Sequence, residues 1–179
     1  KLPEWNTYLS GHGIDIGAGD DGLSKHRHHF PNIKSVRDWD IQDGDAQFMR
    51  GVPDASYDFV HSSHTLEHMR DAAEALCNWW RILAPGGYLI VVVPDWELYE
   101  QGVWPSQWNS DHKQRFSLSS SDAGVIRLQE LVLCLDGVIP ISFETLSQTI
   151  LPQSGCVDYS GYPTMEPAIE MVLRRGLNI

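Results

Sequence analysis

The chain has 179 residues, and its 13 lysines and arginines against 24 aspartates and glutamates give a formal net charge of −11. This acidity argues against nucleic acid or an anionic membrane as a partner, because phosphate binding draws on clustered lysine and arginine. The hydrophobic fraction of 42% is typical of a globular chain, and the longest purely apolar run, residues 89–93, is too short for membrane insertion.

We expect a single domain spanning residues 1–179, because this length is ordinary for one hydrophobic core. The three cysteines lack C-x-x-C spacing, which indicates neither a disulfide framework nor a zinc site. A reducing, cytoplasmic location is the one that this cysteine usage favours. The sequence carries no indication of the oligomeric state.

The first strand pattern is an apolar run at residues 13–16, which breaks into a glycine turn at residues 17–19. A helix is expected over residues 23–30, and a second strand over residues 33–39. The next stretch, residues 40–54, is rich in polar and turn-forming residues. Such a composition predicts a loop rather than a long element.

A third strand is expected over residues 57–60, running on into residues 62–64. The clearest helix follows, because Asp71 and Glu74 form a D-x-x-E capping pair and apolar residues then recur at helical spacing. The apolar run at residues 89–93 is rich in valine and bounded by glycine and proline. It therefore predicts a central strand that is covered on both faces.

Residues 94–117 carry several tryptophans among polar residues, and we interpret this aromatic-rich insertion as a lid over the substrate. Its tryptophans are expected either to form a small core under the loop or to offer apolar walls to a sugar or aromatic substrate. An amphipathic helix is expected over residues 119–135. Two final strands, residues 138–145 and 168–173, flank a connection rich in glycine, proline and serine.

This alternation predicts an α/β fold, a three-layer αβα Rossmann-like sandwich with a mostly parallel sheet between helices. Ligands in such folds bind beyond the carboxyl ends of the strands. We therefore expect the turns at Gly17, Asp40, Ser62 and Pro94 to converge on one cleft.

The glycine turn has two interpretations. Residues 17–22 satisfy G-x-G-x-x-G, and Asp38 follows at the spacing of a dinucleotide fingerprint, which would indicate an NAD(P)-binding oxidoreductase. Asp20 and Asp21 lie inside this loop, however, and each close contact with a pyrophosphate would cost roughly 1 to 4 kcal/mol. A cationic cofactor without phosphate avoids this repulsion. A turn that only lets strand and helix pack closely is the remaining alternative.

Four motifs follow one another along the chain: GIDIGAGD at residues 13–20, GDAQ at 44–47, YDFVHSSHTLEHM at 57–69 and RILAPGGYLIVVVPD at 81–95. In this order they resemble the motif series of class I S-adenosylmethionine-dependent methyltransferases. The ending PAIEMVLRR, residues 167–175, is similar to the single antiparallel, C-terminal strand of that fold. The segments SSHTLEHM, VPD and DHK resemble those of bacterial small-molecule and cell-surface glycan methyltransferases.

The resemblance implies S-adenosylmethionine as cofactor and S-adenosylhomocysteine as product. It implies that the first motif faces the methionine portion, that Asp38 or, preferably, Asp40 accepts hydrogen bonds from the ribose, and that Asp45 with the Ala46 backbone reads the adenine. The implied cofactor-binding residues are Asp15, Gly17, Ala18, Gly19, Asp38, Asp40, Asp45, Ala46, Ser62, Ser63 and His64.

The chain departs from the family pattern at two places. Asp21 stands where a third glycine is frequent, with Gly22 beside it to compensate. The short interval between Asp40 and Tyr57 leaves little room for the helix and strand that normally lie there. The fold is therefore expected to be abbreviated after the second strand.

Histidines supply the candidate catalytic groups. His64, Glu67 and His68 spell H-x-x-E-H, a zinc-binding arrangement, but the string lies within a methyltransferase motif and the sequence offers no evident third ligand, so we expect no metal. Glu67 and His68 are instead expected to position their loop. His112, flanked by Asp111, is the first candidate for a general base and His64 the second, because imidazole exchanges protons near neutral pH. Positioning of the reactants alone is the other alternative.

The expected reaction moves a methyl group to an oxygen of a small-molecule or glycan acceptor, as in polysaccharide biosynthesis. The main alternative is a non-catalytic, cofactor-binding module of a larger glycan-assembly protein. An NAD(P)-binding oxidoreductase is less favoured because of the acidic glycine turn.

Overall fold

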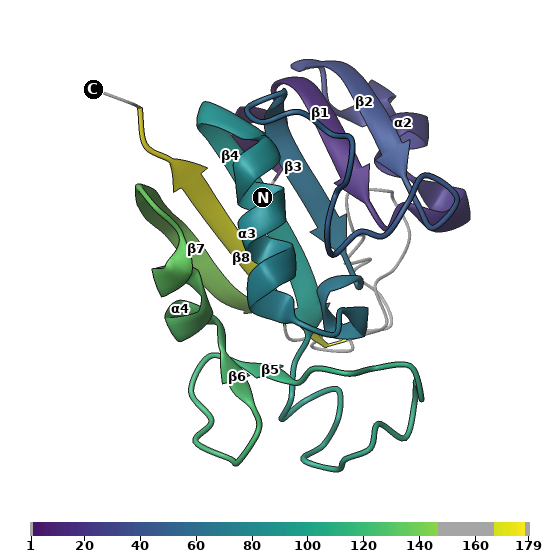
Figure 1. The fold of residues 1–179 in the computed structure, drawn as a ribbon, viewed down its shortest axis with the longest axis vertical. Coiled ribbons are helices and arrows are strands. Elements are labelled where there is room, and N and C mark those ends of the chain that lie inside the picture. Colours follow the sequence, from purple (N-terminus) through teal and green to yellow (C-terminus); the bar gives the residue numbers. More distant parts are fainter. Residues whose placement is uncertain (1, 147–166, 178–179) are drawn as a thin grey trace.

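A computed structural model of the protein describes residues 2–146 and 167–177. Its main sheet has the strand order β2-β1-β3-β4-β8-β7 (Figure 1). Strands β2, β1, β3 and β4 are parallel, and β8 runs antiparallel to both β4 and β7. The strands are β1 Gly11–Ile16, β2 Ile33–Trp39, β3 Tyr57–Ser63, β4 Leu83–Pro94, β7 Val138–Leu146 and β8 Ala168–Arg175, and a separate parallel pair consists of β5 Phe116–Ser117 and β6 Ile126–Arg127.

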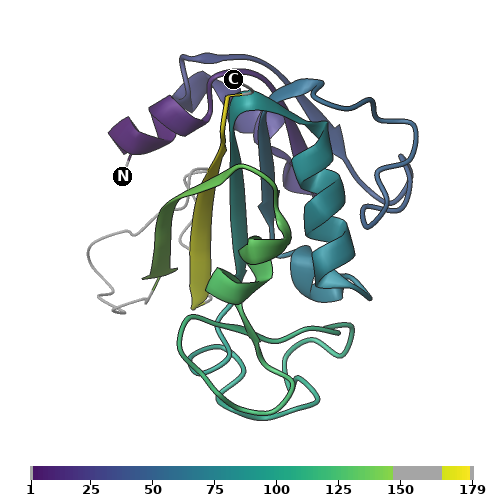
Figure 2. The ribbon, with the colours of Figure 1, turned by 60° about the vertical axis from the view of Figure 1, so that its left-hand side comes forward.

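Helices cover both faces of this sheet, as Figure 2 shows for α1 and α3. One hydrophobic cluster, which includes Leu76 and Trp79, packs α3 against the sheet, and a second, which includes Trp5 and Phe30, covers the other face. The three-layer αβα architecture with one antiparallel C-terminal strand is thus confirmed. The α-helices are α1 Leu2–Tyr8, α2 Leu23–His26, α3 Ala72–Ile82 and α4 Leu128–Leu131, and the 3-10 turns are η1 Gly19–Asp21, η2 Arg27–His29, η3 Leu66–His68 and η4 Val132–Cys134.

Helix α3 begins where the capping pair predicts. The Asp71 side chain accepts a hydrogen bond of 2.9 Å from the backbone N–H of Glu74, which satisfies one of the free donors of the first turn. The indole N–H of Trp79 donates to the carbonyl of Ala46 at 2.9 Å. This bond ties the loop after β2 to the core.

The loop after β2 contains no helix or strand across its described residues 40–56, which confirms the abbreviated fold. Met49 and Val52 pack into the main core instead of a further element. The indole N–H of Trp39 donates to the carbonyl of Gly44 at 3.2 Å and folds the loop back over the end of β2.

Two helix predictions need correction. The helix expected over residues 23–30 is split into α2 and η2. The helix expected over residues 119–135 forms only from Leu128 onward, because Gly124 has a φ of +77° and β6 is extended along β5. The apolar residues Leu128, Val132 and Leu135 are buried as expected. They lie on the short helix α4, on η4 and directly after η4 rather than on one long helix.

In the part of the chain that the structure describes, no helix is long and apolar enough to cross a membrane. The predicted connection between the last two strands and Cys156 lie outside the described residues.

Candidate functional site

A cavity of about 720 Å³ opens at the carboxyl ends of β1, β2 and β3. In the sheet register, Ile16 of β1 lies opposite Trp39 of β2 and Ser62 of β3, so the turns that leave these strands meet at one place. The cavity is lined by Gly17, Trp39, Asp40, Ile41, Gly44, Asp45, Ala46, Gln47, His64, Thr65, His68, Met69, Arg70, Asp111 and Lys113.

The glycine turn closes one side of the cavity. The backbone N–H groups of Gly17 and Ala18 both donate to the carbonyl of Trp39, at 2.9 and 3.2 Å. Gly17 has a φ of +79°, and a Cβ at this position would collide with Oγ1 of Thr65. Only glycine therefore combines this backbone conformation with this close approach.

Asp40 and Asp45 both line the cavity. Asp40 Oδ1 accepts a hydrogen bond of 2.8 Å from the N–H of Ile41, and Asp45 Oδ1 accepts one of 2.9 Å from Gln47. Arg70 lies 3.3 Å from Oδ2 of Asp45. The side chain of Ile41 is 87% exposed although it borders the cavity, which leaves an apolar surface free for a flat ligand.

Several residues that the resemblance implied as cofactor ligands do not line the cavity. Asp15 is buried and accepts hydrogen bonds from the N–H of Leu23 at 2.8 Å and from Nδ1 of His61 at 2.5 Å. Asp38 accepts hydrogen bonds from the backbone N–H and the hydroxyl of Ser24. These carboxylates tie the strands to α2.

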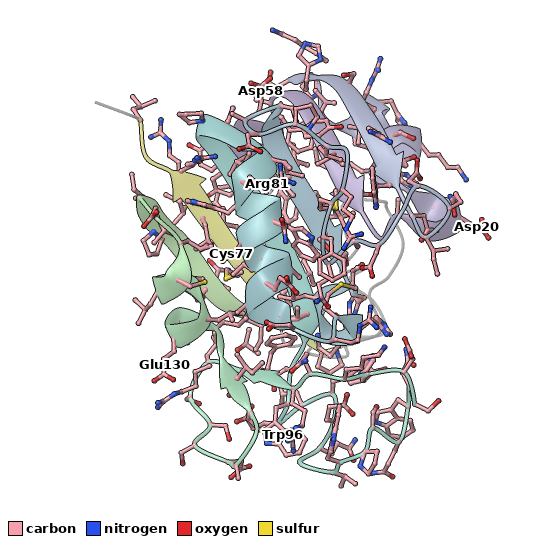
Figure 3. All side chains as sticks on the ribbon, in the orientation of Figure 1. Asp20, Asp58, Cys77, Arg81, Trp96 and Glu130 are labelled. Carbon is pink, nitrogen blue, oxygen red and sulfur yellow. The ribbon has the colours of Figure 1, made fainter. Side chains whose placement is uncertain are left out.

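Other first-motif and third-strand residues that the resemblance implied do not line the cavity either. Ser62 is fully buried, and its hydroxyl donates to the carbonyl of Ile16 at 3.0 Å. Ala18, Gly19 and Ser63 are not among the lining residues. Asp20, next to Gly19, lies at the outer end of the glycine turn (Figure 3).

Three histidines gather around Glu67. His64 lines the cavity with a φ of +52°, and its Nδ1 lies 3.6 Å from Oε1 of Glu67. Nε2 of His68 and Nε2 of His112 each lie 3.9 Å from the same oxygen. Glu67 itself is only 1% exposed. The H-x-x-E-H string of the sequence indicated that His64, Glu67 and His68 are neighbours, but not that His112 contacts Glu67.

Carboxylates hold the outer nitrogens of two of these rings. Nδ1 of His68 lies 2.9 Å from Oδ2 of Asp111, and Nδ1 of His112 lies 2.7 Å from Oε1 of Glu100. The pKa of Asp111 is lowered, first by a hydrogen bond from Lys113 and then by the one from His68. His112 is buried and does not line the cavity, whereas His68 does.

The insertion at residues 94–117 lies beyond the carboxyl ends of the strands and contains Trp96 (Figure 3). It reaches the cavity through Asp111 and Lys113. Its tryptophans are not among the lining residues: Trp96 is buried, its N–H donates to Asp122 at 2.9 Å, and the Arg115 guanidinium stacks on its ring. The expectation of a small core under the loop describes Trp96 best.

Comparison with known proteins identifies related chains. Residues 5–91 match the family model described as a methyltransferase domain. An uncharacterized 37.1 kDa protein in a transposon of Streptomyces fradiae is 31% identical over 88 residues, which cover 49% of this chain and 24% of that protein. The chain thus aligns with about a quarter of this relative's length.

Solved structures share the fold over nearly the whole chain. A SAM-dependent methyltransferase from Archaeoglobus fulgidus superposes with a TM-score of 0.67 at 14% identity, covering 97% of this chain and 91% of that one. An S-adenosylmethionine-dependent methyltransferase from Mesorhizobium loti gives a TM-score of 0.64 at 16% identity, covering 97% and 95%. At these identities the likeness establishes the fold.

Proposed function

We propose that the chain methylates an oxygen of a small-molecule or glycan acceptor. The premise is a methyltransferase domain over residues 5–91, on a class I methyltransferase fold with S-adenosylmethionine as cofactor. The observation that supports this reaction is one cavity lined by two chemically different sets of residues. We call Gly17, Asp40 and Asp45 its first side, and His64 and His68 its second side.

The first side fits the cofactor. Asp40 offers a carboxylate at the end of β2 to the ribose hydroxyls, and Asp45 with Ala46 offers polar groups to the adenine. Ile41 supplies an apolar surface beside them. The acidic character of this side also suits a cationic sulfonium better than a pyrophosphate, because like charges repel at short range.

The second side fits an acceptor hydroxyl. Bound S-adenosylmethionine supplies an electrophilic methyl carbon and a neutral thioether leaving group. His64 faces the cavity and takes the hydroxyl proton as the new carbon–oxygen bond forms, which makes the oxygen a better nucleophile. The walls of the cavity hold the two reactants in line, a contribution of roughly 7 to 11 kcal/mol in well-oriented reactions.

His112, the first candidate for the base, has a different place in this proposal. Its ring is buried between Glu100 and Glu67. In this proposal it therefore contacts these two carboxylates rather than the acceptor. We therefore assign the base to His64.

The insertion at residues 94–117 is proposed to select the acceptor. Trp108 is 60% exposed on it, and Leu98 and Val103 are exposed as well. Apolar side chains of this kind suit the faces of sugars or aromatic rings. A cytoplasmic reaction in polysaccharide biosynthesis, with the whole of residues 1–179 as one domain, belongs to the same proposal.

Isothermal titration with S-adenosylhomocysteine and, separately, with NAD tests the cofactor. One equivalent of S-adenosylhomocysteine and no heat with NAD is expected. Binding of NAD alone would replace the proposal by an oxidoreductase. A non-catalytic module would bind S-adenosylhomocysteine. It would form no S-adenosylhomocysteine when incubated with S-adenosylmethionine and any of a panel of hydroxylated acceptors.

A further inference from the structure

We propose that Glu67, His68 and His112 bind a divalent transition-metal ion at the inner wall of the cavity. Each residue offers one ligand atom, and the three atoms lie within 4.8 Å of one another. Two of the residues come from the H-x-x-E-H string, and the third comes from the insertion. The fold therefore completes a ligand set that the sequence shows only in part.

The distances are close to those of a metal centre. Oε1 of Glu67 lies 3.9 Å from Nε2 of His68 and 3.9 Å from Nε2 of His112. Tetrahedral bonds of about 2.05 Å hold ligand atoms about 3.3 Å apart. The two contacts with Glu67 would each shorten by about half an ångström, and the two imidazole ligand atoms, within 4.8 Å of each other, would also move closer to close the site.

The outer nitrogens of both rings already have the partners that metal-binding histidines use. Nδ1 of His68 faces Asp111 at 2.9 Å, and Nδ1 of His112 faces Glu100 at 2.7 Å. A ring that donates its Nδ1–H to a carboxylate keeps the lone pair on Nε2, and such a carboxylate fixes the ring and strengthens it as a ligand. Here both Nε2 atoms approach Glu67, so two lone pairs converge beside its carboxylate.

Glu67 supplies the independent observation. Both of its carboxylate oxygens are buried, and neither accepts a hydrogen bond from the described residues. A buried carboxylate that accepts no hydrogen bond is costly, and the imidazoles 3.6–3.9 Å away approach it without forming one; proteins normally compensate such a group with a closer partner or a metal. A divalent cation among Glu67, His68 and His112 provides this compensation.

The backbone fixes the cluster in place. The N–H groups of Lys113 and Gln114 donate to the carbonyl of Glu67 at 2.7 and 3.0 Å. These bonds hold the segment of His112 against the turn that carries Glu67 and His68. The ligands from the two segments are therefore preorganised, which lowers the entropy lost on binding.

The donor set indicates the kind of metal. Two imidazoles and one carboxylate suit Zn²⁺ or Fe²⁺ and leave positions open, whereas Mg²⁺ and Ca²⁺ prefer oxygen ligands throughout. Because His68 lines the cavity, an open position would be reached from the acceptor side. An acceptor hydroxyl bound there would lose its proton more readily. This use rests on the proposed function, but metal binding itself does not.

Metal binding is tested on protein stripped with a chelator and titrated with Zn²⁺ by calorimetry and with Co²⁺ by visible absorption. We expect one equivalent of Zn²⁺ and Co²⁺ bands in the visible region. Glu67→Gln and His112→Asn should each weaken binding by about 100-fold or more, and Glu100→Gln by about 10- to 100-fold. His28→Asn, at an exposed histidine of η2, is the matched control and should bind like the unaltered protein.

His68→Asn gives a second route to the result if the buried variants fail to fold, because His68 is only half-buried. Circular dichroism and S-adenosylhomocysteine titration of each variant separate loss of the metal site from loss of the fold or of the cofactor site. Zn²⁺ binding that survives Glu67→Gln and His68→Asn, or the absence of one-equivalent binding in the unaltered protein, would overturn the proposal.

Discussion

Nε2 of His112 lies 3.9 Å from Oε1 of Glu67, and both side chains are buried. This contact joins the insertion to the turn after β3 behind the cavity wall. It separates the roles of the two histidines that the sequence singles out, because His64 lines the cavity and His112 does not. Variants at the two positions should therefore behave differently.

Replacing His64 by alanine is expected to slow methyl transfer by about 10²- to 10⁴-fold, the range of general-base assistance, because the acceptor hydroxyl would lose its proton acceptor. Affinity for S-adenosylhomocysteine should stay nearly unchanged. Release of S-adenosylhomocysteine with an acceptor that turns over measures the rate, and His28→Ala serves as the control. Full turnover by His64→Ala would show that the proton leaves by another route.

Asp40 and Asp38 form a matched pair for cofactor binding. Asp40→Ala should weaken binding of S-adenosylhomocysteine by about 10- to 100-fold, because hydrogen bonds to a charged group contribute about 1.5–3 kcal/mol. Asp38→Ala should lower the melting temperature but leave the affinity nearly unchanged, since Asp38 binds Ser24. Calorimetry and thermal unfolding measure the two effects. The reverse pattern would assign the ribose to Asp38.

Gly17→Ala is expected to destabilise the protein by about 1–3 kcal/mol or more. A φ of +79° is strained for alanine, and the new Cβ would collide with Thr65. Gly19→Ala is the control, because Gly19 has a φ of +54° but its new Cβ would meet no atom within 4 Å, so only the backbone strain remains, roughly 1–2 kcal/mol. Urea unfolding compares the two, and equal losses would contradict the steric argument.

Cys77 is expected to react slowly with iodoacetamide at neutral pH. Cys77 is an exposed residue, but the partial desolvation of its thiol, followed by a hydrogen bond with Cys134 at 3.5 Å, raises its pKa to about 11, so the reactive thiolate is scarce. Figure 3 shows Cys77 on α3. The rate, followed by mass spectrometry, should rise up to about pH 11, and Cys134→Ser should make Cys77 more reactive at pH 8. Reaction at the rate of a free thiol would contradict this environment.

The same thiol predicts a pH dependence of stability. The folded pKa of about 11 lies above the ordinary thiol value of 9.0, so the folded chain keeps a proton that the unfolded chain releases between these values. The stabilising contribution is complete below pH 9 and is lost as the pH rises toward 11. Cys77→Ser should abolish this part of the decline in the urea midpoint, which is small because the thiol is partly exposed.

The sequence predicts the fold well where local chemistry decides it. Asp71 caps α3 as its spacing with Glu74 indicates, and the interval after Asp40 correctly signals an abbreviated sheet. The helix over residues 119–135 is wrong because apolar periodicity does not reveal that β6 pairs with β5. The pairing of β6 with β5 decides the structure of that region, and apolar periodicity indicates only which residues are buried.

The candidate site is less readable from sequence. Counting residues could not separate Asp38 from Asp40, whereas the side chain of one turns to Ser24 and the other borders the cavity. Nor could the sequence connect Glu67 with His112, because their approach depends on how the insertion folds back. Residue type predicts which side chains could bind a ligand or transfer a proton, and tertiary contacts decide which of them lie together in the site.

Among the residues that the structure describes, β7 is the last strand in the sheet order, and this place bears on self-association. An outermost strand offers unpaired backbone groups to another chain, which is a common start of aggregation. β7 also exposes Ile139 and Ile141, but Pro140 between them has no N–H to donate. This proline cannot donate to the hydrogen-bond ladder that a second chain would form along β7. It therefore disfavours edge-to-edge aggregation between the two exposed isoleucines.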